Sequence, residues 1–238
     1  TILGHEFSAE VAQVTPGVQN VAPGDLVAVE PAVSCGRCRY CREGNPNLCM
    51  NLLFAGTPPL DGALQEYVCY RPEFLFPLPV GFSAEDGALL EPLGVALHSW
   101  DLGALRVGES VAIVGCGPIG LLLVQLARIA GAAPILAVEP IGYRRDLAAE
   151  LGAVACSPDD DVAHIAAQHT EGHGVDVAIE VAGQSPAQQV AAKMVKRGGA
   201  LVLVGIPPDD HLSLTHHLVR RKGLTIHVAR RMKHTYPR

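Results

Sequence analysis

A glycine-rich turn at residues 110–120 constrains the fold of this chain more than any other stretch. Its sequence is Ser-Val-Ala-Ile-Val-Gly-Cys-Gly-Pro-Ile-Gly. The β-branched run before the first glycine predicts a buried strand, and the apolar run 121–130, which lacks Gly and Pro, predicts a helix. In such a strand-turn-helix the first glycine makes the turn, the second admits a pyrophosphate and the third lets helix and strand pack closely. We expect the phosphates of a dinucleotide at the helix N-terminus, in contact with Gly115, Gly117, Pro118, Ile119 and Gly120.

An acidic residue, Glu139, ends the next apolar run, 135–138. It follows the glycine turn at the spacing of about 20 residues at which a carboxylate accepts hydrogen bonds from a ribose. A carboxylate at this place would repel the 2′-phosphate of NADP, so the expected cofactor is NAD. The alternative is a helix–sheet turn with an incidental acid at a strand end.

Strands and helices alternate from the glycine turn onward. Buried parallel strands are apolar along their whole length, and right-handed crossovers join them into a doubly wound sheet. The predicted strands are residues 111–114, 135–139, 153–156, 175–181, 201–204 and 224–228. The predicted helices are residues 119–130, 143–151, 162–169, 186–195 and 217–221.

The first 80 residues follow a different pattern, because Gly and Pro interrupt them repeatedly. Their short β-type runs, at residues 10–14, 26–29 and 66–70, predict a small, mostly β domain with long loops. A helix capped by Ser83 and a second helix beginning near Pro92 follow. We therefore expect an α/β chain with a β domain at residues 1–95 and a dinucleotide-binding domain at residues 96–238.

Composition excludes several classes of partner. The chain has 238 residues, 49% of them hydrophobic, which is enough for two ordinary domain cores. A net charge of -6 gives no basic face for nucleic acid or an anionic membrane. No apolar run reaches the roughly 18 residues that span a bilayer. We expect a small-molecule substrate, with neither nucleic acid nor membrane as partner.

Four of the seven cysteines lie within 15 residues, in a loop at residues 34–49 that also contains glycine and proline. Four thiolates from one short loop suit a tetrahedral structural zinc with no open position. An iron–sulfur cluster is the alternative, although nothing else in the chain indicates electron transfer. This clustering disfavours a disulfide framework and favours a reducing compartment, the cytoplasm. The expected ligands are Cys35, Cys38, Cys41 and Cys49.

Two shorter motifs contain further ligand types. His5 and Glu6 follow Gly4, and Glu91 precedes Pro92 at the start of the predicted helix. Taken alone, a His-Glu pair is more often a surface or satisfied polar pair than part of a catalytic metal site.

In their order along the chain, these motifs resemble those of the zinc-dependent medium-chain dehydrogenases/reductases. The matching stretches are Gly-His-Glu-Phe at 4–7, Pro-Gly-Asp at 23–25, the cysteine loop, Glu-Pro-Leu-Gly-Val-Ala-Leu-His at 91–98 and the glycine turn from 114. The resemblance covers essentially the whole chain. It implies a GroES-like β domain, here without its opening strands, followed by a Rossmann domain. It also implies an enzyme that oxidises a secondary alcohol by hydride transfer to NAD.

Within that family the chain is most similar to the polyol branch, which acts on sorbitol or xylitol. Glu91 stands where other alcohol dehydrogenases of the family carry a cysteine ligand, and the run 55–62 also matches the branch. The resemblance implies that His5 is a ligand of the catalytic zinc and that Glu6 is a ligand or a close partner. Glu91 either coordinates the zinc or holds the water beside it. The family's first zinc ligand, a cysteine, would precede Thr1.

The resemblance also implies roles at the cofactor, the substrate and the subunit interface. Arg144 would line the adenosine pocket. Arg231 lies near a substrate-facing arginine of polyol enzymes, but the aromatic residue that normally follows is Met232 here. The basic run 230–234 therefore suits a solvated or subunit-contacting strand end equally well. Relatives form homodimers or homotetramers, often through the edge strand, here residues 224–228.

Two alternatives of function stay open. The first is another zinc dehydrogenase of this fold, acting on L-threonine or on a simple secondary alcohol. The second is a non-catalytic, zinc-stabilised NAD-binding protein. Six further histidines have no ligand spacing, and we expect them to be exposed to solvent: His164, His169, His173, His211, His216 and His217.

Overall fold

A computed structural model describes residues 1–209 and 211–238. It divides the chain into two compact units, one of residues 1–95 with 231–238 and one of residues 96–230. The sequence had placed residues 231–238 in the second unit. They belong to the first because a Cβ added to Gly94 would stand 2.9 Å from Met232 Sδ and 2.7 Å from Thr235 Oγ1, and because Tyr236 stacks on Phe76.

The first unit contains two small antiparallel sheets. Strands β1 (Ser8–Glu10), β2 (Leu26–Val29) and β5 (Leu75–Pro77) form one, in the order β1-β2-β5, and β3 (Ala32–Val33) pairs with β4 (Leu53–Phe54) in the other. The short helices of this unit are α1 (Arg39–Arg42), η1 (Pro46–Leu48), η2 (Pro72–Phe74) and α2 (Ala84–Ala88). The core is built from valines of β2 and its neighbouring loops.

Two predicted strands of this unit are wrong. Strand β1 ends at Glu10, because the segment opposite turns at Gly24, where φ is +92°, just before β2 begins at Leu26. Residues 66–70 form no strand either, and Tyr70 instead packs its ring edge-on against Phe7. Val68 and Tyr70 are half-buried whereas Tyr67 and Cys69 are exposed, so the alternation here comes from side-chain packing without strand pairing.

The two helices that follow residue 83 begin close to the residues that the sequence predicted for them. The hydroxyl of Ser83 accepts the N–H of Asp86, whose carboxylate accepts the N–H of Ser83 in return, so a capping box opens α2. Helix α3 (Leu90–Gly103) begins two residues before Pro92 and contributes residues to both units.

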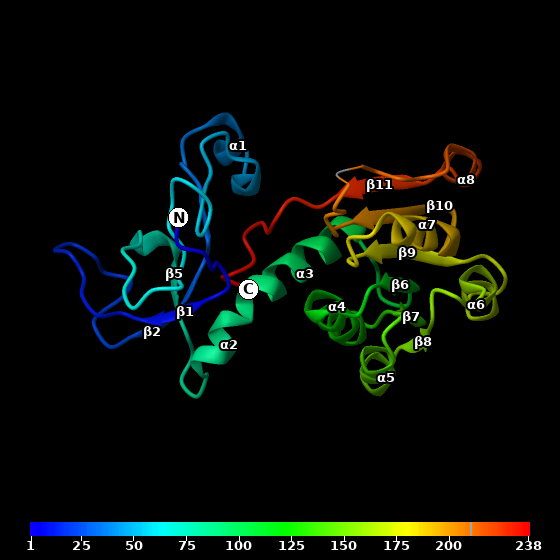
Figure 1. The fold of residues 1–238 in the computed structure, drawn as a ribbon, viewed down its shortest axis with the longest axis horizontal. Helices are drawn as coiled ribbons and strands as arrows, with labels where there is room; N and C mark the ends of the chain where they lie inside the picture. The colour runs from blue at the N-terminus through cyan, green and yellow to red at the C-terminus, as the bar shows by residue number, and fades with distance from the viewer. Residues whose placement is uncertain (210) are drawn as a thin grey trace. The chain divides into compact units, whose positions relative to one another are not determined.

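The second unit is built on a six-stranded parallel sheet (Figure 1). Its strands are β6 (Val111–Val114), β7 (Ile135–Val138), β8 (Val154–Cys156), β9 (Val175–Glu180), β10 (Val195–Leu203) and β11 (Thr225–Val228). Their order in space is β11-β10-β9-β6-β7-β8. This is the doubly wound Rossmann order, with the direction of winding reversing between β6 and β9.

Helices cover both faces of this sheet (Figure 1). Val111 and Ile113 point into one core with α4 (Pro118–Ile129) and α5 (Gly142–Glu150). Ala112 and Val114 point into the other. Helices α6 (Val162–Gln168), α7 (Ser185–Met194) and α8 (His216–Lys222) pack on that second core. Burial on both faces explains why the strands are apolar throughout.

Among the described residues, no helix is both long enough and apolar enough to cross a bilayer.

Candidate functional site

The cysteine loop brings four sulfur atoms together in the first unit. Cys38 is the N-cap of α1, so Cys41 returns to the same side one turn later, and η1 leads the chain back to Cys49. The Sγ of Cys38 lies 3.5 Å from that of Cys41 and 3.9 Å from that of Cys49. Sulfurs about 2.3 Å from a tetrahedral zinc would lie about 3.8 Å apart. The sulfurs of all four cysteines, Cys35 included, lie within 4.8 Å of one another, so they fit a zinc ion.

Backbone donors prepare this loop for a metal. The N–H groups of Arg37 and Cys38 lower the pKa of Cys35 to about 6, which favours the thiolate that binds zinc. The N–H of Cys35 itself donates to Cys49 Sγ at 3.3 Å. Of the cysteines outside the loop, Cys116 and Cys156 are buried, whereas Cys69 is exposed.

His5, Glu6 and Glu91 form a second group of metal-ligating side chains. One ligand atom from each lies within 4.8 Å of the others. His5 and Glu6 precede β1 on a segment held by residues 62–64, since Gly62 N–H donates to Ile2 O at 2.7 Å. Glu91 lies in the first turn of α3. The motifs that stand 85 residues apart in the sequence therefore converge on one site.

Close backbone approach beside His5 depends on a glycine. A Cβ added to Gly62 would stand 2.2 Å from Gly4 O, which is impossible without moving one of the two segments. The run 55–62 matches the polyol branch in sequence. Its last residue, Gly62, has this steric role.

Electrostatics in this group favour a bound cation. Glu91 is only 6% exposed, and its burial, together with the nearby Glu6 carboxylate, raises its pKa to about 7. The positive charge of Arg231 acts in the opposite direction. A divalent cation among the three side chains would stabilise both carboxylates in the charged form. The donor set of one imidazole and two carboxylates therefore fits zinc.

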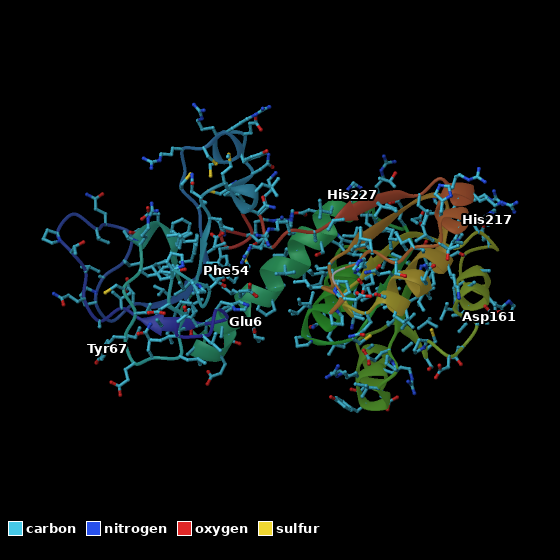
Figure 2. All side chains as sticks on the ribbon, turned by 45° about the horizontal axis from the view of Figure 1, so that its top comes forward. Glu6, Phe54, Tyr67, Asp161, His217 and His227 are labelled. Carbon is cyan, nitrogen blue, oxygen red and sulfur yellow. The ribbon has the colours of Figure 1, made fainter. Side chains whose placement is uncertain are left out.

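Phe54 and Arg231 border the same group. The ring centroid of Phe54 lies 5.0 Å from that of His5, and the Arg231 guanidinium carbon lies 3.5 Å from the centroid of Phe54. Figure 2 marks Glu6 and Phe54 within the first unit. A pocket there is lined by Leu3, Gly4, His5, Glu6, Phe54, Gly56 and Thr57.

The sequence alone does not identify Phe54 as a site residue. A lone aromatic residue at the end of a short strand is ordinarily a core residue, and the only signal was its position directly before the run 55–62. The sequence alone allows Arg231 either a substrate-facing position or a solvated or subunit-contacting one at a strand end. Its side chain is half-buried and stacked on Phe54 rather than solvated at a strand end.

The glycine turn has the three local roles expected of it. Gly115 has φ +101°, and an added Cβ would stand 2.8 Å from Ala182 N. A Cβ on Gly120 would stand 1.9 Å from Gly115 O, so only glycine lets α4 pack against the turn. At Gly117 no atom lies within 4 Å of the Cβ position, which leaves room for a phosphate. Pro118 is the first residue of α4 and Ile119 the second, so the free N–H groups of this helix begin at the turn.

Glu139 has a structural role in addition to the expected contact with ribose. It is 4% exposed, and its two oxygens accept the N–H of Cys116 at 2.6 Å and the N–H of Ile141 at 3.0 Å. The carboxylate therefore braces the glycine turn, and each oxygen keeps a lone pair for a ribose hydroxyl. Arg144 stacks on Tyr143 close by, and it interacts electrostatically with Glu139.

Comparison with known proteins identifies the family. The alcohol dehydrogenase GroES-like domain family matches residues 1–80, and the zinc-binding dehydrogenase family matches residues 118–238. The sorbitol dehydrogenase of Bacillus subtilis is 38% identical over the full length of this chain, which spans 68% of that relative. The chain belongs to the zinc-dependent alcohol dehydrogenases. It is an oxidoreductase of the medium-chain type, so the non-catalytic alternative no longer applies.

Other relatives of this zinc-dependent dehydrogenase differ in substrate and cofactor. The L-threonine 3-dehydrogenase of Caldanaerobacter subterraneus is 38% identical over 98% of the chain, which covers 68% of that relative. A zinc-binding dehydrogenase of Sinorhizobium meliloti, solved with bound NADP, is 35% identical with a TM-score of 0.89. That match covers 98% of this chain and 70% of the other. The expected GroES-like and Rossmann folds are confirmed, as are zinc and a nicotinamide dinucleotide as cofactors.

The six histidines without ligand spacing are all exposed, as predicted. Figure 2 marks one of them, His217, on α8 of the second unit. None of the six joins a metal-ligating group within the part of the chain that the structure describes.

Proposed function

We propose that this dehydrogenase oxidises a secondary hydroxyl of a polyol such as sorbitol or xylitol with NAD. The convergence of His5, Glu6 and Glu91 beside Phe54 and Arg231 is the observation that carries the proposal. The first three residues would hold the catalytic zinc, and the other two would face the substrate.

Each side chain of the group has a distinct task. Zinc, when bound, lowers the pKa of an alcohol hydroxyl, and NAD accepts the hydride. His5 and Glu6 hold the metal on the segment that packs against residues 62–64. Glu91, buried in the first turn of α3, would complete the group, and a bound cation would keep its carboxylate charged. The cysteine loop would hold a second, structural zinc, because four thiolates leave no open position.

Preference for a polyol follows from the groups beside the metal-ligating side chains. The Arg231 guanidinium can donate to several substrate hydroxyls at once, and the face of Phe54 can pack on the C–H groups of an extended sugar alcohol. The sorbitol dehydrogenase relative is consistent with this preference.

L-Threonine is the second candidate substrate, and it too is supported by the position of Arg231. A guanidinium beside the metal-ligating group could pair with the substrate carboxylate in a bidentate fashion, which a simple alcohol cannot do. The similarity to an L-threonine 3-dehydrogenase is consistent with this second candidate.

NAD is the proposed cofactor because Glu139 stands at the end of β7, next to the glycine turn. Its carboxylate would repel a 2′-phosphate. The relative solved with NADP shows that the fold itself also admits NADP.

A rate panel tests the function. Initial rates of the full chain, loaded with zinc, are measured with sorbitol, xylitol, L-threonine and 2-propanol, each with NAD and with NADP at equal concentrations. We expect the highest kcat/KM with a polyol and NAD. A higher value for L-threonine would select the second candidate, and a preference for NADP would overturn the assignment of Glu139.

We also propose a cytoplasmic homodimer or homotetramer. None of the cysteines in the described chain is in a disulfide, which suits a reducing compartment. Strand β11 pairs with β10 and lies at the end of the sheet order, so its outer edge is open to a second copy. Light scattering after size-exclusion chromatography measures the mass, and a monomer at micromolar concentration would contradict the proposal.

A further inference from the structure

The last part of the first unit, residues 231–236, forms an irregular segment that we call the C-terminal strap. We propose that Lys233 is a positioning residue, which ties this strap to the cysteine loop through Asn45 and so holds Arg231 beside the metal-ligating group. The cysteine loop then has a part in substrate selection as well as in stability. This inference rests on the proposed function, because it concerns how Arg231 meets a polyol.

The tie is a direct hydrogen bond within the first unit. Lys233 Nζ donates to Asn45 Oδ1 at 2.7 Å, although the two residues are 188 positions apart. Both residues are half-buried. A half-buried lysine that donates to one amide oxygen has lost part of its rotamer freedom. The bond is therefore a specific attachment rather than a transient surface contact.

Asn45 is a fixed point because the cysteine loop locks its backbone. Its N–H donates to Tyr40 O at 2.8 Å, and its carbonyl accepts the N–H of Leu48 at 3.1 Å. It stands four residues after Cys41 and four before Cys49. The position of its side-chain oxygen is thus set by the same fold that gathers the four sulfurs.

The strap itself needs outside attachments. Arg231 and His234 have φ values of +56° and +49°, a left-handed conformation that is costly for residues other than glycine. Such a conformation persists only where surrounding contacts hold it. Met232 is buried beside Gly94, and Tyr236 donates its hydroxyl to Val29 O at 2.9 Å. These two contacts, at Met232 and Tyr236, hold the strap against the rest of the first unit.

Lys233 lies between these anchors, two residues after Arg231. Its bond restrains the part of the strap from which the guanidinium reaches Phe54. Without that bond, Met232 and Tyr236 would keep the strap on the first unit, but the backbone at Arg231 would gain freedom. A displacement of about 1 Å in a substrate-positioning group can cost on the order of 100-fold in rate. We therefore expect a change in substrate selection and little change in stability.

The test compares four single variants and one double variant of the full chain. Lys233→Met and Asn45→Leu each remove the tie, and Lys233→Arg keeps a donor and should rescue it. Arg39→Met is the matched control, because it breaks an exposed ion pair with Glu43 on the same cysteine loop without touching the strap. The measurements are kcat and KM for sorbitol and for 2-propanol, zinc per chain, and the rate of tryptic cleavage after Arg231 by mass spectrometry.

We expect each tie-breaking variant to raise the KM for sorbitol by about tenfold, with kcat for 2-propanol and zinc content unchanged. Tryptic cleavage after Arg231 should be several times faster. The double variant Lys233→Met/Asn45→Leu should be no worse than either single one, because both remove one bond. Lys233→Arg and Arg39→Met should behave like the parent.

Two results would overturn the inference. One is a sorbitol KM and a cleavage rate that stay at the parent values in both single variants, and the other is additive losses in the double variant. If the parent chain oxidises no polyol, the proposed function fails instead. The cleavage rates then decide by themselves whether the tie holds the strap.

Discussion

His5 tests the metal-ligating group at the scale of a single residue. In His5→Ala we expect zinc content to fall from two ions to one per chain, since the cysteine loop is untouched. Dehydrogenase activity should fall by at least about 100-fold, because even an indirect partner of a metal ligand is worth 10–100-fold. Atomic absorption and initial rates measure both effects. His217→Ala is the control, because His217 is exposed on α8, and it should change neither.

Glu30 makes stability depend on pH. Burial raises the pKa of this carboxyl from 4.5 to about 7. The folded chain thus keeps a proton that the unfolded chain releases, and the free energy of unfolding falls as pH rises from about 4.5 through 7. Compared with Glu30→Gln, the parent should lose up to about 3 kcal/mol between pH 5 and pH 8.

Urea denaturation of both proteins at the two pH values measures this difference. Glu10→Gln, at an exposed position of β1, is the control and should follow the parent. A parent whose stability relative to Glu30→Gln is the same at pH 5 and pH 8 would contradict the buried, protonated carboxyl.

At the scale of an element, two glycines of the strand-turn-helix that begins with β6 have different roles, one in cofactor binding and the other in folding. An alanine at Gly117 would place its Cβ in open space, so Gly117→Ala should keep the parent stability but weaken NADH binding by about tenfold or more. An alanine at Gly120 would collide with the backbone of Gly115, so Gly120→Ala should lose several kcal/mol of stability as well.

Thermal unfolding and NADH fluorescence titration distinguish the two variants. Gly142→Ala is a matched control, because no atom lies within 4 Å of its Cβ position at the start of α5. It should match the parent in both measurements. Equal cofactor affinity in Gly117→Ala and the parent would rule out phosphate contact at that residue.

At the scale of the whole molecule, the two units have separate hydrophobic cores. Both metal-ligating groups belong to the first unit, and the glycine turn belongs to the second. Removing zinc with a strong chelator should therefore abolish dehydrogenase activity while NADH binding stays within about threefold of its starting value. Loss of NADH binding together with zinc would show that the second unit depends on the first.

Much of this arrangement was predictable from local sequence. The glycine spacing predicted the cofactor turn because the close contacts of Gly115 and Gly120 and the open space at Gly117 are set by the turn and the segment next to it. The apolar runs predicted the parallel sheet because both of its faces are buried. The cysteine spacing predicted the sulfur cluster because one short helix and one 3-10 turn suffice to close it. The failures, at residues 11–14 and 66–70, lie where some side chains, such as those of Val11 and Tyr70, pack on the core but the backbone joins no strand.

The sequence alone thus predicted the doubly wound unit, the glycine turn and the cysteine cluster, because those features depend on short-range geometry. Only the tertiary structure decided that residues 231–238 join the first unit and that Arg231 stacks on Phe54 near Glu91. The same holds for the bond from Lys233 to Asn45. These contacts link residues that no local pattern relates, and packing against a common core brings them together.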